Sequence, residues 1–387
     1  MTPETKHILL IGAGHAHLQV MVQAKTLARA GARLTLVSPE PFWFYPNMAT
    51  EVLSGHYSLA DFRVDLRALT ERYGVALVLD EVVSLLPEHR KVLTRMGRML
   101  DYDFISFNLG AQSSEPEGDV LVDGSYPLTP IRNIIEIRNE VETLLELEPD
   151  RKLEAMVLGG GPSGVETACN LASLLTERAP QAGWTVTLLE AKARVLPGLP
   201  DQAARLAAQQ LERVGVLVRT GAEIQHVQSG RVVLDKGETL PCDLAVVAMG
   251  TRVQDLFIQA NLLTDDAGAL LVERTLRLRD HPEIFAAGDC TRLWKMDLNR
   301  SGEFAAAEGP LLARNLLAVL RGKSLKPYSG RARSMIISLG PRDALWIKGR
   351  HVIHGTWVLA WKHRRDRRWI RPFQVRSVSP HSVSPAS

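Results

Sequence analysis

Apolar and polar residues alternate in blocks near the N-terminus, and these blocks predict a strand, a glycine turn, a helix and a second strand. His7–Ile11 is a short apolar run that ends at glycine, which is typical of a buried parallel strand. Residues 16–30 have helical spacing and end at Gly31, and Arg33–Val37 is the next apolar run. We expect a β-α-β unit of about thirty residues here.

The same order of blocks recurs in the middle of the chain. Glu154–Leu158 leads into the letters GGGPSG, Val165–Leu175 has helical spacing, and Thr185–Leu189 is apolar. Each unit is followed by a strand-rich stretch, residues 75–107 and 216–249, that ends in an acidic residue, an apolar strand and a glycine. Two such units predict an α/β chain with two Rossmann-like dinucleotide-binding domains.

The remaining blocks complete a division into domains. Residues 280–290 predict a strand that runs into Gly-Asp, residues 303–320 a helix, and residues 335–339 and 344–348 two strands of a small α+β region. We therefore expect the first part of the first domain in residues 1–115, the second domain in 116–252, the second part of the first domain in 253–325, the C-terminal region in 326–373 and a disordered Ser/Pro-rich tail in 374–387.

Composition narrows the class of protein. A chain of 387 residues with 45% hydrophobic and 23% charged residues is typical of a multidomain globular protein, and a net charge of +3 argues against a surface built for polyanions. Cys169, Cys242 and Cys290 lie far apart, so we expect no disulfide scaffold and a cytoplasmic location. The N-terminal apolar run is short and lacks a basic leader, so we interpret it as a strand rather than a signal peptide.

The first glycine loop, IGAGHAHLQV, keeps two glycines of a G-x-G-x-x-G fingerprint. Gly12 and Gly14 occupy the positions that permit the tight turn and the approach of a pyrophosphate, while His17 replaces the glycine needed for helix–strand packing. A metal site at His15 and His17 is disfavoured, because residues two apart on a helix point in different directions and no cysteine or carboxylate cluster is near. We expect a packed, hydrogen-bonded His17 and a His15 that approaches the bound ligand.

The second strand of the first unit lacks its usual terminal acid. Ser38 stands in that place and Glu40 follows two residues later. Either the Ser38 hydroxyl or Glu40 is a candidate for the adenosine ribose; the alternative is that both are simply solvated.

The second glycine loop is complete. Gly159, Gly161 and Gly164 fill all three positions, with Pro162 and Ser163 between them. This pattern predicts a dinucleotide pyrophosphate at the N-terminus of the following helix.

The strand that follows ends in an acid. Glu190 is placed to accept both ribose hydroxyls of NAD and to repel a 2′-phosphate, although Lys192 and Arg194 nearby weaken that preference. Glu166, just inside the helix, is either a first-turn acid favoured by the helix dipole or a contact of the nicotinamide.

Gly288 and Asp289 follow the last predicted strand of the first domain. A carboxylate there can bind the hydroxyls of a ribityl chain, which favours a flavin; alternatively, Asp289 is an ordinary helix cap.

In this order, the motifs resemble those of the FAD/NAD(P)-binding pyridine nucleotide-disulfide oxidoreductase superfamily: Gly12 and Gly14, Gly110 in FNLGA, GGGPSGVE, Gly250 in VVAMG, and FAAGDC. Within it the chain is similar to the type II NADH dehydrogenase and sulfide:quinone oxidoreductase group. GAGHAHL, SPEPFWFYPNM, EVLSGHYSLADFRVDLRAL and WKHRRDRRW resemble the flavoprotein module found joined to selenide, water dikinase, over roughly residues 6–373.

The resemblance implies an FAD-dependent NAD(P)H dehydrogenase in which the flavin carries the chemistry and no catalytic acid or base is required. The FAD site would comprise Gly12, Gly14, His15, Ser38, Glu40, Pro46, Val82, Gly110, Gly288 and Asp289, with Pro46 at the flavin ring. The NAD site would comprise Gly159, Gly161, Pro162, Ser163, Gly164, Glu166, Glu190 and Gly250. No metal is expected.

The electron acceptor stays open. Quinone-reducing relatives carry a glutamine-rich segment where this chain has Ala305–Gly309, and this departure argues against a quinone. The candidate acceptors are a quinone or another small molecule. Sulfide chemistry is disfavoured because the cysteines are unsuitably placed. A non-catalytic flavoprotein partner or sensor linked to selenium metabolism is the main alternative, and the complete second loop argues for turnover instead.

The C-terminal run, WVLAWKHRRDRRWIRP, suggests a peripheral contact with the inner face of a membrane through residues 356–373. Its arginines, Arg364, Arg365, Arg367 and Arg368, are expected to scatter around a helix rather than form one polar face. A solvated basic end or a homodimer contact is equally compatible with this run, whereas nucleic-acid binding is disfavoured because no reading module surrounds it.

Overall fold

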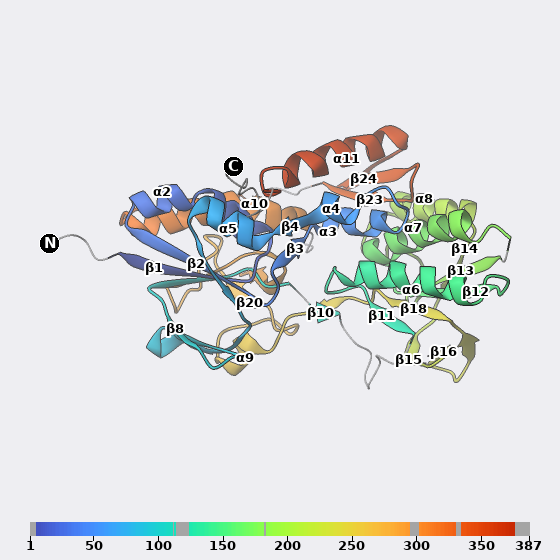
Figure 1. Ribbon diagram of the computed structural model, residues 1–387, viewed down its shortest axis with the longest axis horizontal. Helices are drawn as coiled ribbons and strands as arrows, with labels where there is room; N and C mark the ends of the chain where they lie inside the picture. Colours follow the sequence, from blue (N-terminus) through green and yellow to red (C-terminus); the bar gives the residue numbers. More distant parts are fainter. Residues whose placement is uncertain are drawn as a thin grey trace, which may run out of the picture.

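The computed structural model describes residues 5–110, 112–113, 124–181, 183–294, 302–329 and 334–375. These residues form two lobes side by side, with a small sheet and a helix from the C-terminal region along one edge of both (Figure 1). The two lobes account for the two predicted nucleotide-binding units.

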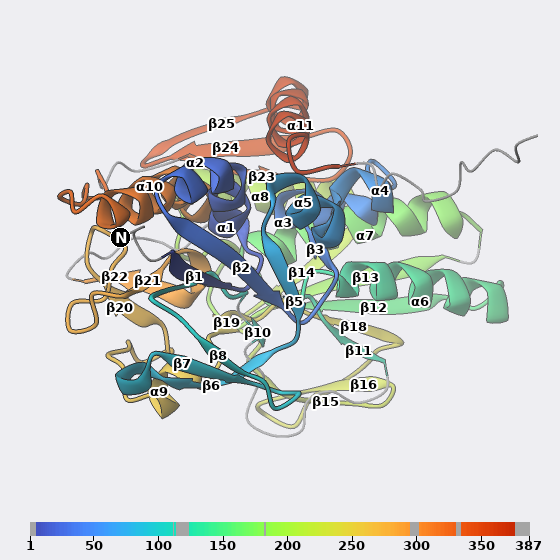
Figure 2. The same ribbon diagram turned by 60° about the vertical axis from the view of Figure 1, so that its left-hand side comes forward.

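The first lobe is built on a five-stranded parallel sheet in the order β21-β9-β1-β2-β5. Its strands are β1 (Lys6–Ile11), β2 (Ala32–Ser38), β5 (Ala76–Leu79), β9 (Phe104–Phe107) and β21 (Ile284–Ala286). Helices α1 (His15–Val22), α2 (Ala24–Arg29), α5 (Leu66–Tyr73) and α10 (Gly302–Leu320) lie on one side of the sheet. An antiparallel sheet of β6 (Val82–Leu86), β7 (Lys91–Thr94) and β8 (Met99–Asp101) lies on the other (Figure 2).

The second lobe repeats this plan with the strand order β11-β18-β12-β13-β14. Its strands are β11 (Ser125–Pro127), β12 (Leu153–Leu158), β13 (Trp184–Glu190), β14 (Val216–Thr220) and β18 (Leu244–Val247). Its helices are α6 (Asn133–Leu147), α7 (Pro162–Arg178) and α8 (Asp201–Arg213), and its antiparallel sheet consists of β15 (Ile224–Gln228), β16 (Arg231–Leu234) and β17 (Thr239–Pro241). The predicted α/β class with two Rossmann-like units is confirmed.

The two lobes differ in where along the chain the edge strand of the parallel sheet comes. In the second lobe the edge strand β11 precedes α6, whereas in the first lobe the edge strand β21 arrives only after the whole second lobe has been formed. The chain therefore returns to the first sheet and carries the Gly288–Asp289 turn back to the carboxyl ends of β1 and β9.

Short elements connect the lobes and the C-terminal region. The segment after β2 contains β3 (Phe42–Phe44), α3 (Pro46–Ala49), the 3-10 helix η1 (Thr50–Val52), α4 (Leu59–Phe62) and β4 (Arg63–Asp65). The C-terminal region contains β23 (Met335–Ser338), β24 (Ala344–Lys348), β25 (His351–His354) and α11 (Thr356–Ile370). The remaining elements are η2 (Pro87–His89), β10 (Gln112–Ser113), β19 (Thr251–Arg252), α9 (Leu256–Gln259), β20 (Leu270–Val272), η3 (Gly288–Cys290) and β22 (Thr291–Leu293).

The predicted elements are largely found, with two differences. The helix expected over residues 16–30 is two helices, α1 and α2, that meet at Gln23. The strand expected over residues 280–290 is confined to β21, because Gly288 adopts a left-handed φ of +78° and turns the chain. Most of the predicted tail, residues 376–387, lies outside the described residues.

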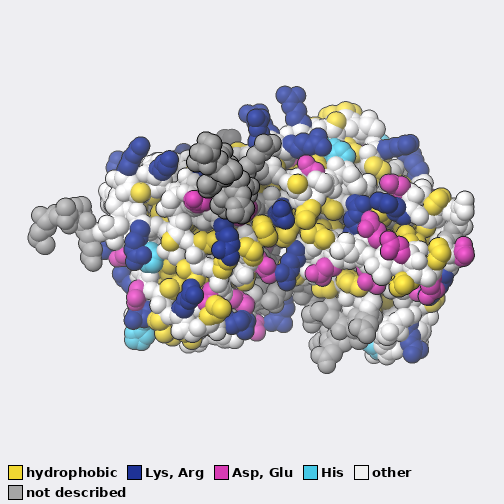
Figure 3. Space-filling view, in the orientation of Figure 1, with side chains coloured by type: hydrophobic (Ala, Val, Ile, Leu, Met, Phe, Trp, Pro, Cys, Tyr) yellow, Lys and Arg dark blue, Asp and Glu magenta, His cyan; other side chains and the backbone are white. Residues whose placement is uncertain are grey.

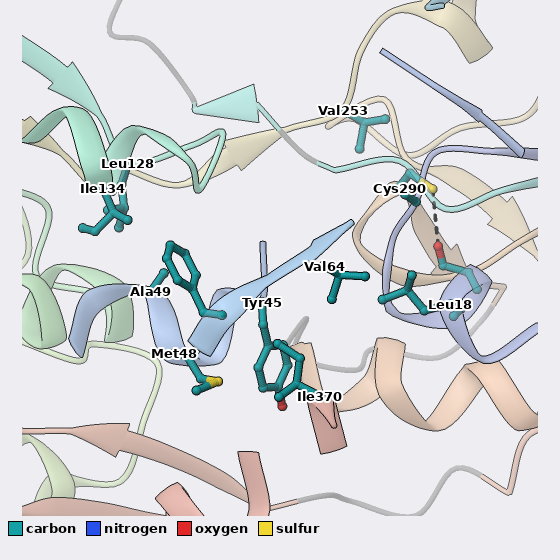
Figure 4. Packing of buried hydrophobic residues seen from close by; sticks show 14 of the residues in the cluster. Leu18, Tyr45, Met48, Ala49, Val64, Leu128, Ile134, Val253, Cys290 and Ile370 are labelled. Carbon is teal, nitrogen blue, oxygen red and sulfur yellow. Dashed lines mark hydrogen bonds between the residues drawn. The ribbon is translucent and has the colours of Figure 1, made fainter. Parts of the chain in front are cut away.

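One hydrophobic core joins the three parts of the molecule. Figure 4 shows Leu18 and Val64 of the first lobe, Leu128 and Ile134 of the second, and Ile370 of α11 in the same packed cluster. Each of these side chains is nearly or fully buried. Through Ile370, α11 packs into the same core as both lobes.

Candidate functional site

The first glycine loop is fixed by an asparagine at the end of β9. A side chain at Gly12, where φ is +84°, would lie 2.6 Å from the Asn108 carbonyl oxygen, and one at Gly14 would lie 2.5 Å from the Asn108 amide carbon. Asn108 Oδ1 accepts a hydrogen bond from the Ala16 amide (2.8 Å), and its Nδ2 donates to the Ala287 carbonyl (2.8 Å). Asn108 thereby ties the N-terminus of α1 to the turn after β21. Sequence reasoning missed Asn108, although it noted Gly110 in the same FNLGA segment.

His17 fills the position of the missing packing glycine. Its Nδ1 donates to the Gly12 carbonyl (2.6 Å), and its Nε2 accepts from the Ser106 hydroxyl (2.8 Å). Complete burial lowers the pKa of His17 to about 4, so the ring is neutral at pH 7. The prediction of a packed, hydrogen-bonded histidine is confirmed.

His15 faces an aromatic cluster at the start of α1. Its ring lies 5.0 Å from Trp43, 5.4 Å from Tyr45 and 4.9 Å from Trp369 between ring centroids. Burial lowers the pKa of His15 to about 4, and its Nε2 has no hydrogen-bond partner among the described residues. An approach of His15 to a bound cofactor stays a prediction.

Ser38 and Glu40 lie at the end of β2 but differ in surroundings. Ser38 is buried and its hydroxyl donates to the Glu40 carbonyl (3.0 Å). The Glu40 carboxylate is about half exposed and forms an ion pair with Arg132 of the second lobe. Glu40 thus keeps a solvent-facing position from which a ribose is accessible.

The turn after β21 is held by a buried acid on α10. The Gly288 amide donates to Glu308 Oε2 (2.7 Å), a contact that sequence reasoning missed. At the next residue α10 touches α1 closely, since a side chain at Gly309 would lie 2.9 Å from Gln19 Cβ and 3.1 Å from Ala16 Cα. The first glycine loop and the Gly-Asp turn are therefore one rigid unit.

The other predicted FAD residues surround this unit. Asp289, Pro46 and Gly110 are exposed, and nothing lies within 4 Å of a side chain built at Gly110. Val82, the first residue of β6, is buried. The three exposed residues leave backbone and carboxylate groups accessible to a ligand.

The second glycine loop combines tight packing with an open approach. A side chain at Gly164 would lie 1.8 Å from the Gly159 carbonyl oxygen, and Gly159 has φ +110°. By contrast, nothing lies within 4 Å of a side chain built at Gly161. Since Pro162 and Ser163 begin α7 immediately afterwards, Gly161 leaves space at a helix N-terminus, where phosphate is favoured.

Glu190 is positioned beside this loop by backbone hydrogen bonds. Its Oε2 accepts from the Gly160 amide (2.8 Å) and its Oε1 from the Lys192 amide (2.7 Å). The carboxylate is fixed at the end of β13, and each oxygen retains a lone pair for a further donor.

Arg194 and Gly250 complete the surroundings of the second loop. Arg194 is turned away from Glu190, because its guanidinium donates to the Leu199 carbonyl (2.8 Å). Gly250 follows β18, is exposed and adopts φ +56°. The Arg194 guanidinium is therefore held by the loop that leads to α8.

Glu166 contacts the C-terminal region. It is the fifth residue of α7 rather than a first-turn acid, and its Oε1 accepts from the Ser338 amide on β23 (2.8 Å). Burial raises the pKa of the Glu166 carboxyl to about 7, against an opposing effect of Lys362. Contact with a nicotinamide stays a prediction.

A buried charged cluster joins η1 to α11. Lys362 Nζ donates to Glu51, to Asp366 Oδ2 (3.0 Å) and to the Asn47 carbonyl (2.5 Å), while His363 Nε2 contacts Glu51 Oε1 (2.5 Å). Burial disfavours both charges, yet the Lys362 ammonium lowers the pKa of Glu51, and Glu51 and Asp366 raise that of Lys362. Burial raises the pKa of Asp366. Sequence reasoning missed the whole cluster.

The solvent-facing side of α11 carries a stripe of tryptophan and arginine side chains. Trp357, Trp361, Arg364 and Arg368 are exposed and fall within about 60° of one another at 100° per residue. Arg365 and Arg367 fall about 160° apart on the same wheel, so the four arginines do not share one face, as expected. Figure 3 shows basic and apolar side chains together along the edge formed by α11.

Within the described ranges, no three His, Cys, Asp or Glu side chains are grouped so as to hold a metal ion. In the same part of the chain, every helix is too short or too polar to cross a membrane.

Two parallel sheets, each with a glycine loop that leads from a central strand, β1 or β12, into a helix, define a protein with two dinucleotide-binding units. Residues 6–310 match the pyridine nucleotide-disulphide oxidoreductase family, and the chain belongs to that family. It is accordingly a flavoprotein oxidoreductase that uses FAD with NAD(P)H as co-substrate.

Similar proteins are found by sequence and by structure. The chain is 23% identical over 366 residues to a type II NADH:quinone oxidoreductase of Staphylococcus saprophyticus, covering 90% of each chain. It is 24% identical over 364 residues to the protein of that name from Staphylococcus aureus, covering 89% of this chain and 90% of the other.

Among solved structures, the sulfide:quinone oxidoreductase of Aquifex aeolicus is similar with a TM-score of 0.80 at 16% identity, covering 96% of this chain and 93% of that one. NDH2 from Plasmodium falciparum, in complex with NADH, is similar with a TM-score of 0.77 at 15% identity, covering 94% and 97%. These likenesses support the fold.

Proposed function

We propose that the protein oxidises NADH and passes the electrons through FAD to a quinone. The observation that carries this proposal is the pair of loops, each at the N-terminus of a helix, with Gly161 open to a ligand and Asp289 exposed beside the first loop. The name of the staphylococcal relatives, type II NADH:quinone oxidoreductase, supports a quinone as acceptor.

We assign FAD to the first lobe. The α1 N-terminus and the backbone at Gly12 and Gly14 would hold the pyrophosphate, and Asp289 would bind the ribityl hydroxyls. The proposed contacts are completed by His15, Ser38, Glu40, Pro46, Val82, Gly110 and Gly288. FAD, when bound, supplies a centre that accepts a hydride and passes on two electrons.

We assign the nicotinamide nucleotide to the second lobe. Gly161, Pro162 and Ser163 would receive the pyrophosphate, with Gly159 and Gly164 shaping the turn. Glu190 would accept both ribose hydroxyls, which favours NADH over NADPH. Glu166 and Gly250 would lie toward the nicotinamide.

The buried cysteines argue against sulfide chemistry. Cys169, Cys242 and Cys290 are all buried, and the Cys290 thiol donates to the Ala287 carbonyl (3.4 Å). Burial raises the pKa of Cys242 and of Cys290 to about 12, so neither is a thiolate at neutral pH. NADH therefore remains the better electron donor.

An acceptor screen tests the proposed function. Purified protein loaded with FAD should oxidise NADH steadily with a short-chain ubiquinone or menaquinone analogue. If the protein oxidises NADH with ferricyanide but with neither quinone analogue, it is a dehydrogenase with another physiological acceptor.

We also propose that α11 docks the protein on an anionic lipid surface. Trp357 is 59% and Trp361 43% exposed, and Arg364 and Arg368 share their face, which suits the boundary between headgroups and acyl chains. Trp357→Ser with Trp361→Ser should weaken binding to phosphatidylglycerol vesicles about tenfold or more. The matched control is Leu217→Ser, an equally exposed apolar side chain on the second lobe; equal binding of both variants would dismiss the docking surface.

A further inference from the structure

The charged cluster between η1 and α11 continues into a connected series of polar side chains. His363 Nε2 meets Glu51 Oε1 (2.5 Å), and Glu51 Oε2 meets the Lys362 ammonium. Lys362 Nζ meets Asp366 Oδ2 (3.0 Å), and Asp366 Oδ1 accepts from the Tyr45 hydroxyl (3.3 Å). Every link joins two groups that carry or accept a proton.

The series has one end near solvent and one end inside. The His363 side chain keeps 11% exposure, whereas the side chains of Glu51 and Lys362 keep 2% and that of Asp366 none. His363 also stacks on His56, with centroids 3.6 Å apart, and His56 is only partly buried. A proton from water therefore reaches the imidazoles before it reaches the carboxylates.

The inner end lies where the flavin ring is proposed to bind. Tyr45 and Asn47 flank Pro46, and the Asn47 carbonyl accepts from the same Lys362 ammonium (2.5 Å). The side-chain amide of Asn47 (Nδ2) also donates to the Tyr45 hydroxyl (3.2 Å). The series thus ends at the two neighbours of the residue assigned to the ring.

The charges of the cluster leave room for an additional proton. One ammonium, Lys362, is shared by the carboxyls of Glu51 and Asp366, and Glu166 of α7 acts on the same ammonium. Arg365 Nε also lies 3.8 Å from Asp366 Oδ1. A neutral cluster needs one cation per carboxylate, so three carboxyls around these two cations favour protonation of at least one carboxyl. Burial raises the pKa of both Asp366 and Glu166 accordingly.

The proposed reaction requires such a proton. NADH supplies a hydride, which is two electrons and one proton, whereas a quinone takes up two electrons and two protons to become a quinol. Each turnover, NADH + H⁺ + quinone → NAD⁺ + quinol, therefore draws one proton from solvent. This step rests on the proposed function.

We propose that His363, Glu51, Lys362, Asp366 and Tyr45 form the proton-uptake route of quinone reduction. A proton enters at His363 and passes to Glu51. Lys362 takes it up while giving another of its protons to Asp366, so Nζ always keeps three protons. Asp366 then passes its proton to the Tyr45 hydroxyl oxygen while that hydroxyl gives its own proton to the acceptor. These residues act by proton relay and carry neither hydride nor electrons.

The groups that face this route come from several elements. They are Tyr45, Glu51, His56, Tyr57, Glu166, Lys362, His363, Arg365, Asp366 and Arg367. A substitution that keeps shape but removes proton exchange is therefore more informative than a pH profile alone.

The test compares two acceptors in the FAD-loaded protein. Ferricyanide takes single electrons and no proton, so its reduction bypasses the route. Asp366→Asn and Glu51→Gln should each lower kcat with a short-chain quinone at least tenfold and raise its solvent deuterium isotope effect. With ferricyanide, kcat should change less than twofold. The control, Arg350→Gln at an exposed position in the turn before β25, should behave as wild type with both acceptors.

The outcomes separate the route from the function. Suppose that the wild type reduces quinone. If the variants then lose quinone and ferricyanide activity equally, or keep both activities, the proton route is wrong while the proposed function stands. If wild type reduces no quinone, the proposed function and the route fail together. If Asp366→Asn does not fold, His363→Gln replaces it, because this substitution leaves the ion pairs of Lys362 in place. His363→Gln should lower quinone turnover at least threefold and leave ferricyanide turnover unchanged.

Discussion

The rings of Tyr45 and Trp369 lie parallel, with centroids 4.6 Å apart and 14° between their planes. Tyr45 precedes α3 of the first lobe and Trp369 is near the end of α11, so the stack joins segments more than three hundred residues apart. Together with the Lys362 cluster, it makes α11 part of the first lobe's core.

Removal of this stack should cost stability. Trp369→Ala should lower the free energy of unfolding by about 3 kcal/mol, because a large packed ring is lost, and Trp369→Phe by about 1 kcal/mol. Urea unfolding measures both. The control, Trp357→Ala at an exposed position on the same helix, should change the free energy of unfolding by less than about 0.5 kcal/mol. If Trp369→Ala changed it by as little as this control, the stabilising role of the stack would be contradicted.

Two neighbouring glycines should respond differently to alanine. Gly161→Ala meets no protein atom, so fold and FAD content should persist while the KM for NADH rises about tenfold or more. Gly164→Ala meets a backbone carbonyl at 1.8 Å and should prevent folding. Flavin absorbance and steady-state kinetics distinguish these outcomes, and an unchanged KM in Gly161→Ala would place the nucleotide elsewhere.

Glu190 should determine the choice of nucleotide. Glu190→Ala should raise the KM for NADH about tenfold, since a charged hydrogen bond contributes about 1.5–3 kcal/mol, and should raise that for NADPH less. Circular dichroism should be recorded alongside, because Glu190 also holds the amides of Gly160 and Lys192. Equal changes for both nucleotides would remove the ribose assignment.

Glu166 should make stability depend on pH. Its pKa is raised in the folded protein to about 7, so its burial costs nothing when it is protonated and becomes unfavourable as pH rises from about 4.5 through about 7. Glu166→Gln mimics the protonated form. It should match wild type near pH 4.5 and be more stable by roughly 2–3 kcal/mol at pH 8. Parallel stability curves across this range would show that Glu166 is not buried as described.

The fold and both loops were predictable because their signals are local. Each apolar run, glycine turn and helix is specified within about thirty residues, so Gly12, Gly161 and Glu190 could be placed before any tertiary contact was known. His17 followed from the same pattern, since only one packing position departed from the fingerprint. Its role was correctly inferred as a hydrogen-bonded side chain.

The charged cluster was not predictable, because its partners are distant. Lys362 belongs to a basic run that is typical of a solvated face, and its partner Glu51 is 311 residues away. Asn108 and Glu308 were missed for a similar reason, since their contacts with Ala287 and Gly288 depend on the return of the chain to the first sheet. One signal was available: Lys362 and Asp366 are four residues apart and share a helix face with the apolar residues Val358 and Ile370.

The most direct test is anaerobic mixing of the purified, FAD-loaded protein with NADH, followed by addition of a quinone. NADH should bleach the flavin absorbance in one phase, and a stoichiometric amount of quinone should restore it. A flavin that stays oxidised with both NADH and NADPH would contradict the proposed oxidation of a nicotinamide nucleotide through FAD.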